Sequence, residues 1–158
     1  MAKNKLQVIY DFDFLLLALN ANVKPYKLAW CLNKDLKLNL VKAENIEIGF
    51  NEQKSLSIQN FLDRSEFQTV RLIRNRAEDT DGAYNAYLLP ELKNFDYLVL
   101  LENESSTFDE NTFISEVKRI PFVQFTTKID IQSLKSKDNL IFFHSINLFS
   151  LFIFSAAI

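Results

Sequence analysis

Glycine is nearly absent from this chain, and its scarcity limits the sites that the chain can build. Only Gly49 and Gly82 occur among 158 residues, whereas average usage would give about 11. No Gly-x-Gly-x-x-Gly turn and no Gly-x-x-x-x-Gly-Lys-Ser/Thr loop can therefore be written, which excludes the nucleotide sites built on those motifs. A single cysteine and a single histidine likewise exclude an intrachain disulfide and a Cys/His zinc cluster.

The remaining composition is that of one globular domain. Apolar residues make up 48% of the chain, charged residues 24%, and the formal net charge is −2. The charges are spread evenly, without the basic excess that is typical of nucleic-acid-binding domains. No apolar signal region follows the first residues, and the lone Cys31 fits a reducing compartment, so we expect a cytoplasmic protein.

The hydrophobic pattern predicts strands that alternate with two helices. A helix is expected over 23–36, with Asn22 as N-cap and Pro25 in its first turn. A second helix is expected over 108–120, capped by Asp109 or Thr107 and ended by Pro121. Strands are expected at 10–19, 67–76, 97–101 and 122–131, with one or two in 38–50 and a short apolar run at 87–89.

This order of elements predicts one α+β domain over residues 6–142. It resembles a ferredoxin-like α/β plait, in which two main helices cover one face of a mostly antiparallel sheet. The polar residues 51–54 are expected to form a turn, and residues 77–82 an acidic loop.

A nine-residue segment carries a recognisable motif. Residues 89–97 (LPELKNFDY) resemble the signature I-P-E-x-x-x-V-D-Y of a family of small bacterial proteins. Pro90, Glu91, Asp96 and Tyr97 match the signature. The segments 10–14, 26–33 and 134–142 are also similar to that family, so the resemblance covers about residues 6–142. It implies a cytoplasmic protein without an assigned activity, and it carries over no catalytic residue.

The motif itself allows two interpretations. Pro90 can open a tight turn, while Glu91 and Asp96 satisfy backbone amides there. Alternatively, Glu91 and Asp96 form a carboxylate pair for acid–base chemistry or a cation. We favour the structural interpretation, because no histidine or glycine loop accompanies the pair. Similarly, Asp11 and Asp13 are interpreted as a solvated strand face rather than a metal site, and no metal or cofactor is predicted.

Three arginines fall on one predicted strand. Arg74 and Arg76 share a face and, with Arg71, suit a phosphate or an RNA backbone. Acidic residues follow at once in 78–81 and would partly neutralise this charge. Protection of a sheet edge by charge is therefore the favoured interpretation.

The first helix places Tyr26, Trp30 and Asn33 on one side. Aromatic residues there are typical anchors of a binding face, but they are equally suited to a core. We favour the core for Trp30 and regard Tyr26 as a possible binding residue. Cys31 is expected to be a small buried apolar residue.

Residues 143–158 are predicted to be an apolar C-terminal extension. No Asp, Glu, Lys or Arg occurs in 139–158, and a run of this length satisfies the criterion for a membrane span. Polar residues interrupt the run, however, so burial on the domain or on another subunit is favoured over membrane contact.

Together these features favour a non-enzymatic protein-interaction module that binds a protein partner or forms a homo-oligomer. The alternative is an RNA- or nucleotide-binding protein that uses the basic strand with Arg71, Arg74 and Arg76. An enzyme has the least support, since the sequence offers no catalytic constellation.

Overall fold

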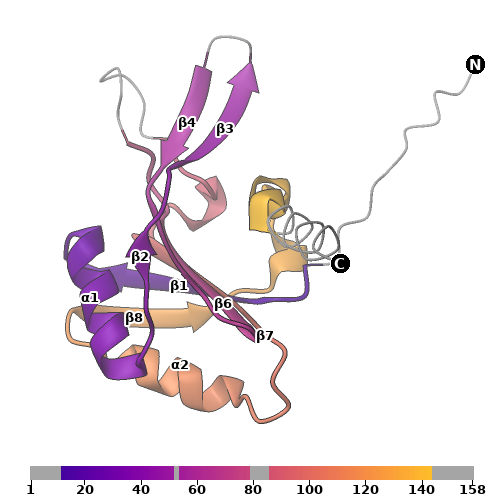
Figure 1. Ribbon diagram of the computed structural model, residues 1–158. Helices are drawn as coiled ribbons and strands as arrows, with labels where there is room; N and C mark the ends of the chain where they lie inside the picture. Colours follow the sequence, from indigo (N-terminus) through magenta and orange to yellow (C-terminus); the bar gives the residue numbers. More distant parts are fainter. Residues whose placement is uncertain (1–11, 52–53, 79–85, 144–158) are drawn as a thin grey trace, which may run out of the picture.

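The computed structural model describes residues 12–51, 54–78 and 86–143. They form an α+β structure with a six-stranded sheet and two helices, from which a two-stranded hairpin projects (Figure 1). The α+β class and the antiparallel sheet predicted from the sequence are thus confirmed.

The order of strands in the main sheet is β2-β5-β6-β7-β1-β8, and every neighbouring pair is antiparallel. The strand β1, which lies between β7 and β8, is buried on both faces, which explains why its sequence is continuously apolar rather than alternating. The strands of this sheet are β1(Leu15–Ala21), β2(Val41–Lys42), β5(Asn60–Arg64), β6(Gln68–Arg74), β7(Tyr97–Asn103) and β8(Val123–Lys128), and those of the hairpin are β3(Ile46–Asn51) and β4(Lys54–Ile58).

Both helices, α1(Pro25–Leu36) and α2(Glu110–Arg119), pack on one face of the sheet. Leu28 and Leu32 of α1 and Val117 of α2 lie in the same apolar layer as Leu17 and Leu19 of β1. This arrangement agrees with the prediction of two main helices on one face.

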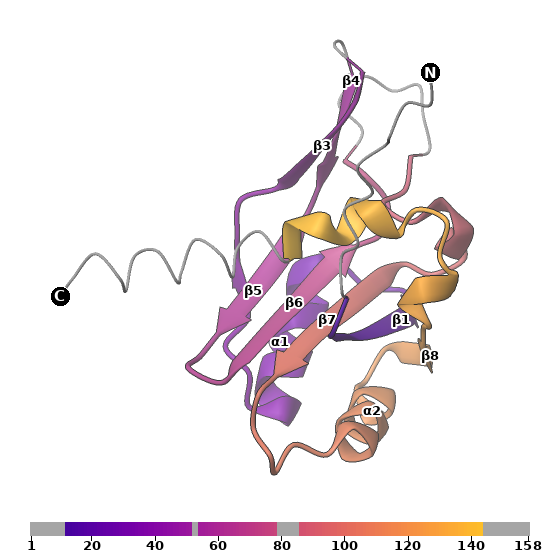
Figure 2. The same cartoon turned by 90° about the vertical axis from the view of Figure 1, so that its right-hand side faces the viewer.

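The opposite face is covered by the C-terminal part of the described chain (Figure 2). Leu134, Leu140 and Phe143 pack there against Leu16 and Leu98 of the sheet. The short 3-10 helices on this side are η1(Pro90–Leu92), η2(Ile131–Ser133) and η3(Lys137–Leu140).

The helix boundaries agree with the sequence only in part. The side chain of Asp109 accepts a hydrogen bond from the backbone N of Asn111 and caps α2, as predicted, and the helix ends before Pro121. The Asn22 cap is wrong, because α1 begins at Pro25 with Lys24 as its N-cap residue and no side-chain cap.

The strands differ from the prediction in three places. First, β4 and β5 are not predicted by the hydrophobic pattern. Second, residues 87–89 form only an isolated bridge, between Tyr87 and Arg76. Third, β6 lies between β5 and β7, so its arginines do not protect an edge. Both faces of β6 contribute residues to a packed apolar layer. A charged side chain on β6 must therefore have a polar partner or lie near the end of the strand.

The predictions for 144–158 fall outside the described residues, as do those for Tyr10, Asp11 and most of the acidic loop. Phe143, assigned to the extension from sequence, is buried in the apolar layer. Within the described ranges, no helix is both long enough and apolar enough to cross a membrane.

Candidate functional site

The turn that carries the motif is organised by a buried asparagine, Asn75, just after β6. Its Oδ1 accepts a hydrogen bond from the Leu89 amide at 2.9 Å, and its Nδ2 donates to the carbonyl oxygen of Leu92 at 2.8 Å. Its backbone N–H donates to the Asp96 carbonyl, and its carbonyl accepts from Leu88. One fully buried side chain thus satisfies both ends of the turn.

Asp96 and Tyr97 hold the connection between β1 and α1. The Asp96 carboxylate accepts a hydrogen bond from the Ala21 amide at 3.0 Å, and the Tyr97 hydroxyl donates to the Val23 carbonyl. Burial, opposed by Arg74 and reinforced by Asp96, raises the pKa of Tyr97 to about 12. The phenol is therefore a neutral donor at physiological pH, which fits the structural interpretation of these two residues.

Pro90 and Glu91 lie on η1, and Glu91 contacts a different element. Its carboxylate accepts hydrogen bonds from the backbone N of Ser136, at 2.8 Å, and from the Ser136 hydroxyl. Burial opposes ionisation of Glu91, but the bonds from Ser136 outweigh it and hold the pKa of the carboxyl below its ordinary value. Glu91 and Asp96 therefore bind different segments of the chain. Through them the motif turn is linked to the segment at Ser136 and to the connection between β1 and α1.

The three arginines of the predicted basic strand do not lie in one site. Arg71 is buried on the face opposite the helices, where its Nη1 donates to Asn60 Oδ1 at 2.6 Å. Burial, helped by the nearby Arg64, lowers the pKa of Arg71 to about 10, so it stays charged at neutral pH. Because Arg71 is inaccessible, it cannot bind a phosphate or an RNA backbone together with Arg74 and Arg76.

Arg74 and Arg76 line one cleft together with Asp96 and Tyr97. The cleft has a volume of about 340 Å³ and lies where β6 ends, between residues 21–23 and the turn before β7. Lys93, which the sequence analysis did not single out, adds a third cation. The sequence-predicted residues Arg74, Arg76, Asp96 and Tyr97 are thus brought together, whereas Pro90 and Glu91 are not among the lining residues.

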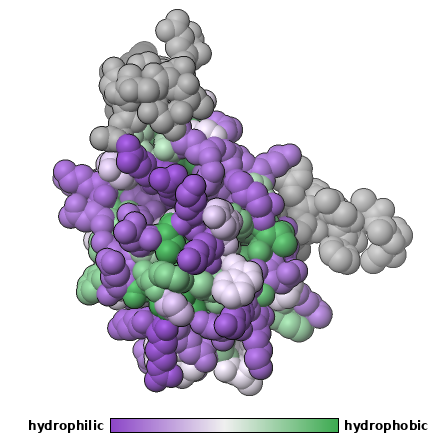
Figure 3. Space-filling model, turned by 90° about the vertical axis from the view of Figure 1, so that its left-hand side faces the viewer, coloured by the Kyte–Doolittle hydropathy of each residue, from purple (hydrophilic) through white to green (hydrophobic). Residues whose placement is uncertain are grey.

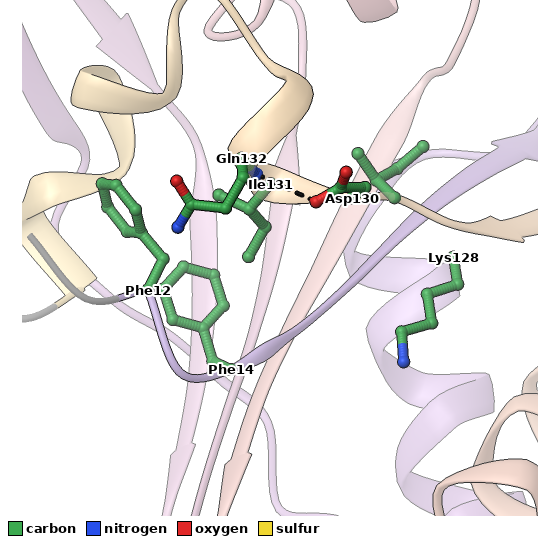
Figure 4. A pocket seen from close by; sticks show the side chains of 7 residues that line it. Phe12, Phe14, Lys128, Asp130, Ile131 and Gln132 are labelled. Carbon is green, nitrogen blue, oxygen red and sulfur yellow. Dashed lines mark hydrogen bonds between the residues drawn. The ribbon is translucent and has the colours of Figure 1, made fainter.

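A second hollow, of about 440 Å³, lies beside the start of β1 (Figure 4). Its polar side chains already have partners in the fold. Lys128 is ion-paired to Glu110 of α2 and lies well apart from the two phenyl rings. Asp130 accepts a hydrogen bond from the backbone N of Gln132 at 3.1 Å. It offers a ligand less polar chemistry than the cleft does. Its walls are formed by Phe12, Phe14 and residues 128–132.

The solvent side of α1 carries large aromatic side chains. Tyr26 is 65% exposed and Trp30 is 61% exposed, so the prediction that Trp30 lies in the core is wrong. Leu28 and Leu32 form the buried stripe instead. Trp30 stands two residues from each, about 200° around the helix. Cys31 is buried, as predicted.

Lysines and a further ring accompany these aromatic residues. The Lys34 Nζ lies 5.3 Å from the ring centre of Trp30, and the Lys27 Nζ lies 4.3 Å from that of Phe122. Seen from this side of the molecule, apolar and weakly polar side chains are interspersed among hydrophilic ones (Figure 3). We refer to Tyr26, Lys27, Trp30, Lys34 and Phe122 as the aromatic face.

Comparisons with protein-family models, with curated proteins and with solved structures find no match to this chain. The resemblance of residues 89–97 to the I-P-E-x-x-x-V-D-Y signature therefore stays a prediction. The features of the structure that bear on function are the cleft and the aromatic face.

Replacing Asn75 with alanine should destabilise the protein. The substitution leaves the Leu89 amide buried without a partner, and it also removes the bond to the Leu92 carbonyl. We expect the free energy of unfolding to fall by about 2–4 kcal/mol, measured by urea denaturation. Asn94→Ala is the matched control, because Asn94 is an exposed residue of the same turn. Equal losses for both variants would contradict the role assigned to Asn75.

The bonds between Glu91 and Ser136 should make stability depend on pH. A carboxyl whose pKa is lowered in the folded state stabilises the fold above its unfolded-state pKa, and this contribution is lost as pH falls through the folded-state value. Glu91→Gln should therefore cost up to about 1 kcal/mol at neutral pH, a modest figure because the site is exposed to solvent. The difference from the unsubstituted protein should close well below pH 4.5, the ordinary value.

Chemical denaturation across this pH range measures the effect. Glu104→Gln, at an exposed carboxylate in the loop after β7, serves as the control. A Glu91→Gln deficit of constant size at every pH would contradict the pKa argument.

Proposed function

We propose that this chain is a non-enzymatic protein-interaction module that binds an acidic protein surface through the aromatic face. The observation that carries the proposal is the exposure of Trp30 and Tyr26, one turn apart on α1. Tryptophan and tyrosine are enriched among the residues that dominate binding energy at protein interfaces. Exposure of such large apolar surfaces to water is unfavourable, and contact with a partner removes them from water.

The charge around these rings supports an acidic partner. Residues 24–37 contain four lysines and one aspartate, a net charge of +3 in a chain whose net charge is −2. Lysines around an aromatic centre complement carboxylates on a partner, steer its approach and disfavour basic competitors. The aromatic rings then supply contact area, and the lysines supply selectivity.

Phe122 provides a further argument. Its backbone φ is 77°, a conformation that bulky residues rarely adopt, and its side chain is 46% exposed. Strained backbone of this kind is concentrated at functional sites, where the surrounding structure holds it in place. Here the strain presents a phenyl ring beside Lys27, at the border of the aromatic face.

We also propose that the core of the fold is a ferredoxin-like plait. Along the chain, β1, α1, β6, β7, α2 and β8 follow the order strand-helix-strand-strand-helix-strand. In the sheet these strands lie in the order β6-β7-β1-β8. On this interpretation β2, β3, β4 and β5 are an insertion between α1 and β6, and α1 remains available on the surface.

Trp30→Ala should weaken partner binding at least tenfold, about 1.4 kcal/mol, while changing stability little because the side chain is exposed. The partner is first identified by a photo-cross-linking residue at position 30 in native cells, and its affinity is then measured by titration. Phe67, which is 56% exposed and lies in the turn between β5 and β6, provides the control position.

The expected adduct joins position 30 to an acidic segment of a protein, and it disappears with Lys27→Glu plus Lys34→Glu. An adduct obtained equally from position 67 would contradict the proposal. So would an adduct with RNA, or one that survives the charge reversal.

A further inference from the structure

The cleft at the end of β6 has a composition that the aromatic face does not explain. Among the described residues, Arg74, Arg76 and Lys93 contribute three cationic groups to its lining, and Asp96 contributes a carboxylate. The Asp96 carboxylate already accepts a hydrogen bond from the Ala21 amide. The lining therefore carries a net positive charge in a protein whose net charge is negative, which attracts anions.

Arg74 is the group that most needs a ligand. It is half-buried on β6, directly across from Tyr97 in the neighbouring strand. Within residues 12–51, 54–78 and 86–143, its guanidinium has no hydrogen-bond acceptor and no ion-pair partner. The nearby Tyr97 hydroxyl donates its hydrogen to Val23. Arg71, three residues earlier on the same strand, instead has Asn60 as its partner.

A partly buried guanidinium without a partner is unfavourable, because water has been removed and no acceptor replaces it. Its planar, five-donor geometry matches the oxygen atoms of a phosphate, and such charge-assisted bonds are about twice as strong as neutral ones. An anion in the cleft would give Arg74 an acceptor, and the charges of Arg76 and Lys93 on the same lining would attract it.

The apolar part of the lining indicates the size and shape of the ligand. The residues Tyr87, Phe95 and Tyr97 also line the cleft, and aromatic rings there can stack on a planar group. A volume of about 340 Å³ lies at the lower end of the range for small-molecule sites. It suits a molecule of mononucleotide size rather than a polymer.

We propose that this cleft binds a small phosphorylated molecule with a planar ring, of the nucleoside monophosphate class. Arg74 contacts the phosphate at the inner end of the cleft, Arg76 and Lys93 contact it from the rim, and the ring packs against the aromatic side chains. None of the residues that line this cleft belongs to the aromatic face, so the proposal stands or falls independently of the proposed function.

The test is a titration of the full-length, isotope-labelled protein with AMP, followed by NMR. We expect amide shifts confined to the cleft, at residues 21–23, 74–76, 87 and 93–97, with half-saturation below about 1 mM. Arg74→Ala should weaken AMP binding at least tenfold. Arg74→Gln, which keeps a polar side chain of similar length, should weaken it to a similar degree and guards against a folding defect. Arg119→Ala, at an exposed arginine on α2, should leave the affinity unchanged.

Three further probes distinguish the contribution of the phosphate from that of the ring, and a mononucleotide from RNA. Inorganic phosphate should shift the same amides more weakly than AMP, and adenosine, which lacks the phosphate, should not bind measurably. Adenosine binding as tight as that of AMP would overturn the proposal, as would the absence of shifts with AMP. A short single-stranded RNA that binds more tightly, with shifts extending beyond the cleft, would replace it with a nucleic-acid surface.

Discussion

The side-chain amide of Asn75 is the interaction on which the motif turn depends. It is fully buried at the end of β6, and it supplies an acceptor to Leu89 and a donor to Leu92. These bonds replace water for a stretch of backbone that forms no strand and only the single 3-10 turn η1. Such backbone can be buried only when its polar groups find partners. The residues on the turn can bind other segments because Asn75 first holds the turn itself.

From this turn, contacts extend to both layers of the fold. Asp96 and Tyr97 hold the connection that leads into α1, and Glu91 holds Ser136 on the opposite face. The same turn also contributes Lys93 to the cleft that Arg74 lines. The motif is thus best understood as a structural junction that brings the cations of the cleft together. The aromatic face begins at Tyr26, in the first turn of α1, on the helix that this junction positions.

The sequence predicts those parts of the fold where one physical signal dominates. The continuous leucines of β1 and β7 predict buried strands, and Asp109 with Pro121 marks the ends of α2. Trp30 could not be placed, because apolar residues occur around most of α1 and periodicity does not identify the buried stripe. Nor could the cleft be predicted, because Arg71 and Arg74 look alike in sequence. In the structure Arg71 is buried against Asn60, whereas Arg74 has no side-chain partner among the described residues. A single asparagine such as Asn75 carries no pattern at all.

The central role of Asn75 is tested most directly by native-state hydrogen exchange of the Leu89 amide. If its bond to Asn75 Oδ1 is part of the cooperative core, this amide should exchange only through global unfolding, as slowly as the amides of β7. Its exchange should then follow the stability of the whole protein as denaturant is added. Exchange through a local opening of low free energy, insensitive to denaturant, would contradict this account and make the motif turn a peripheral loop.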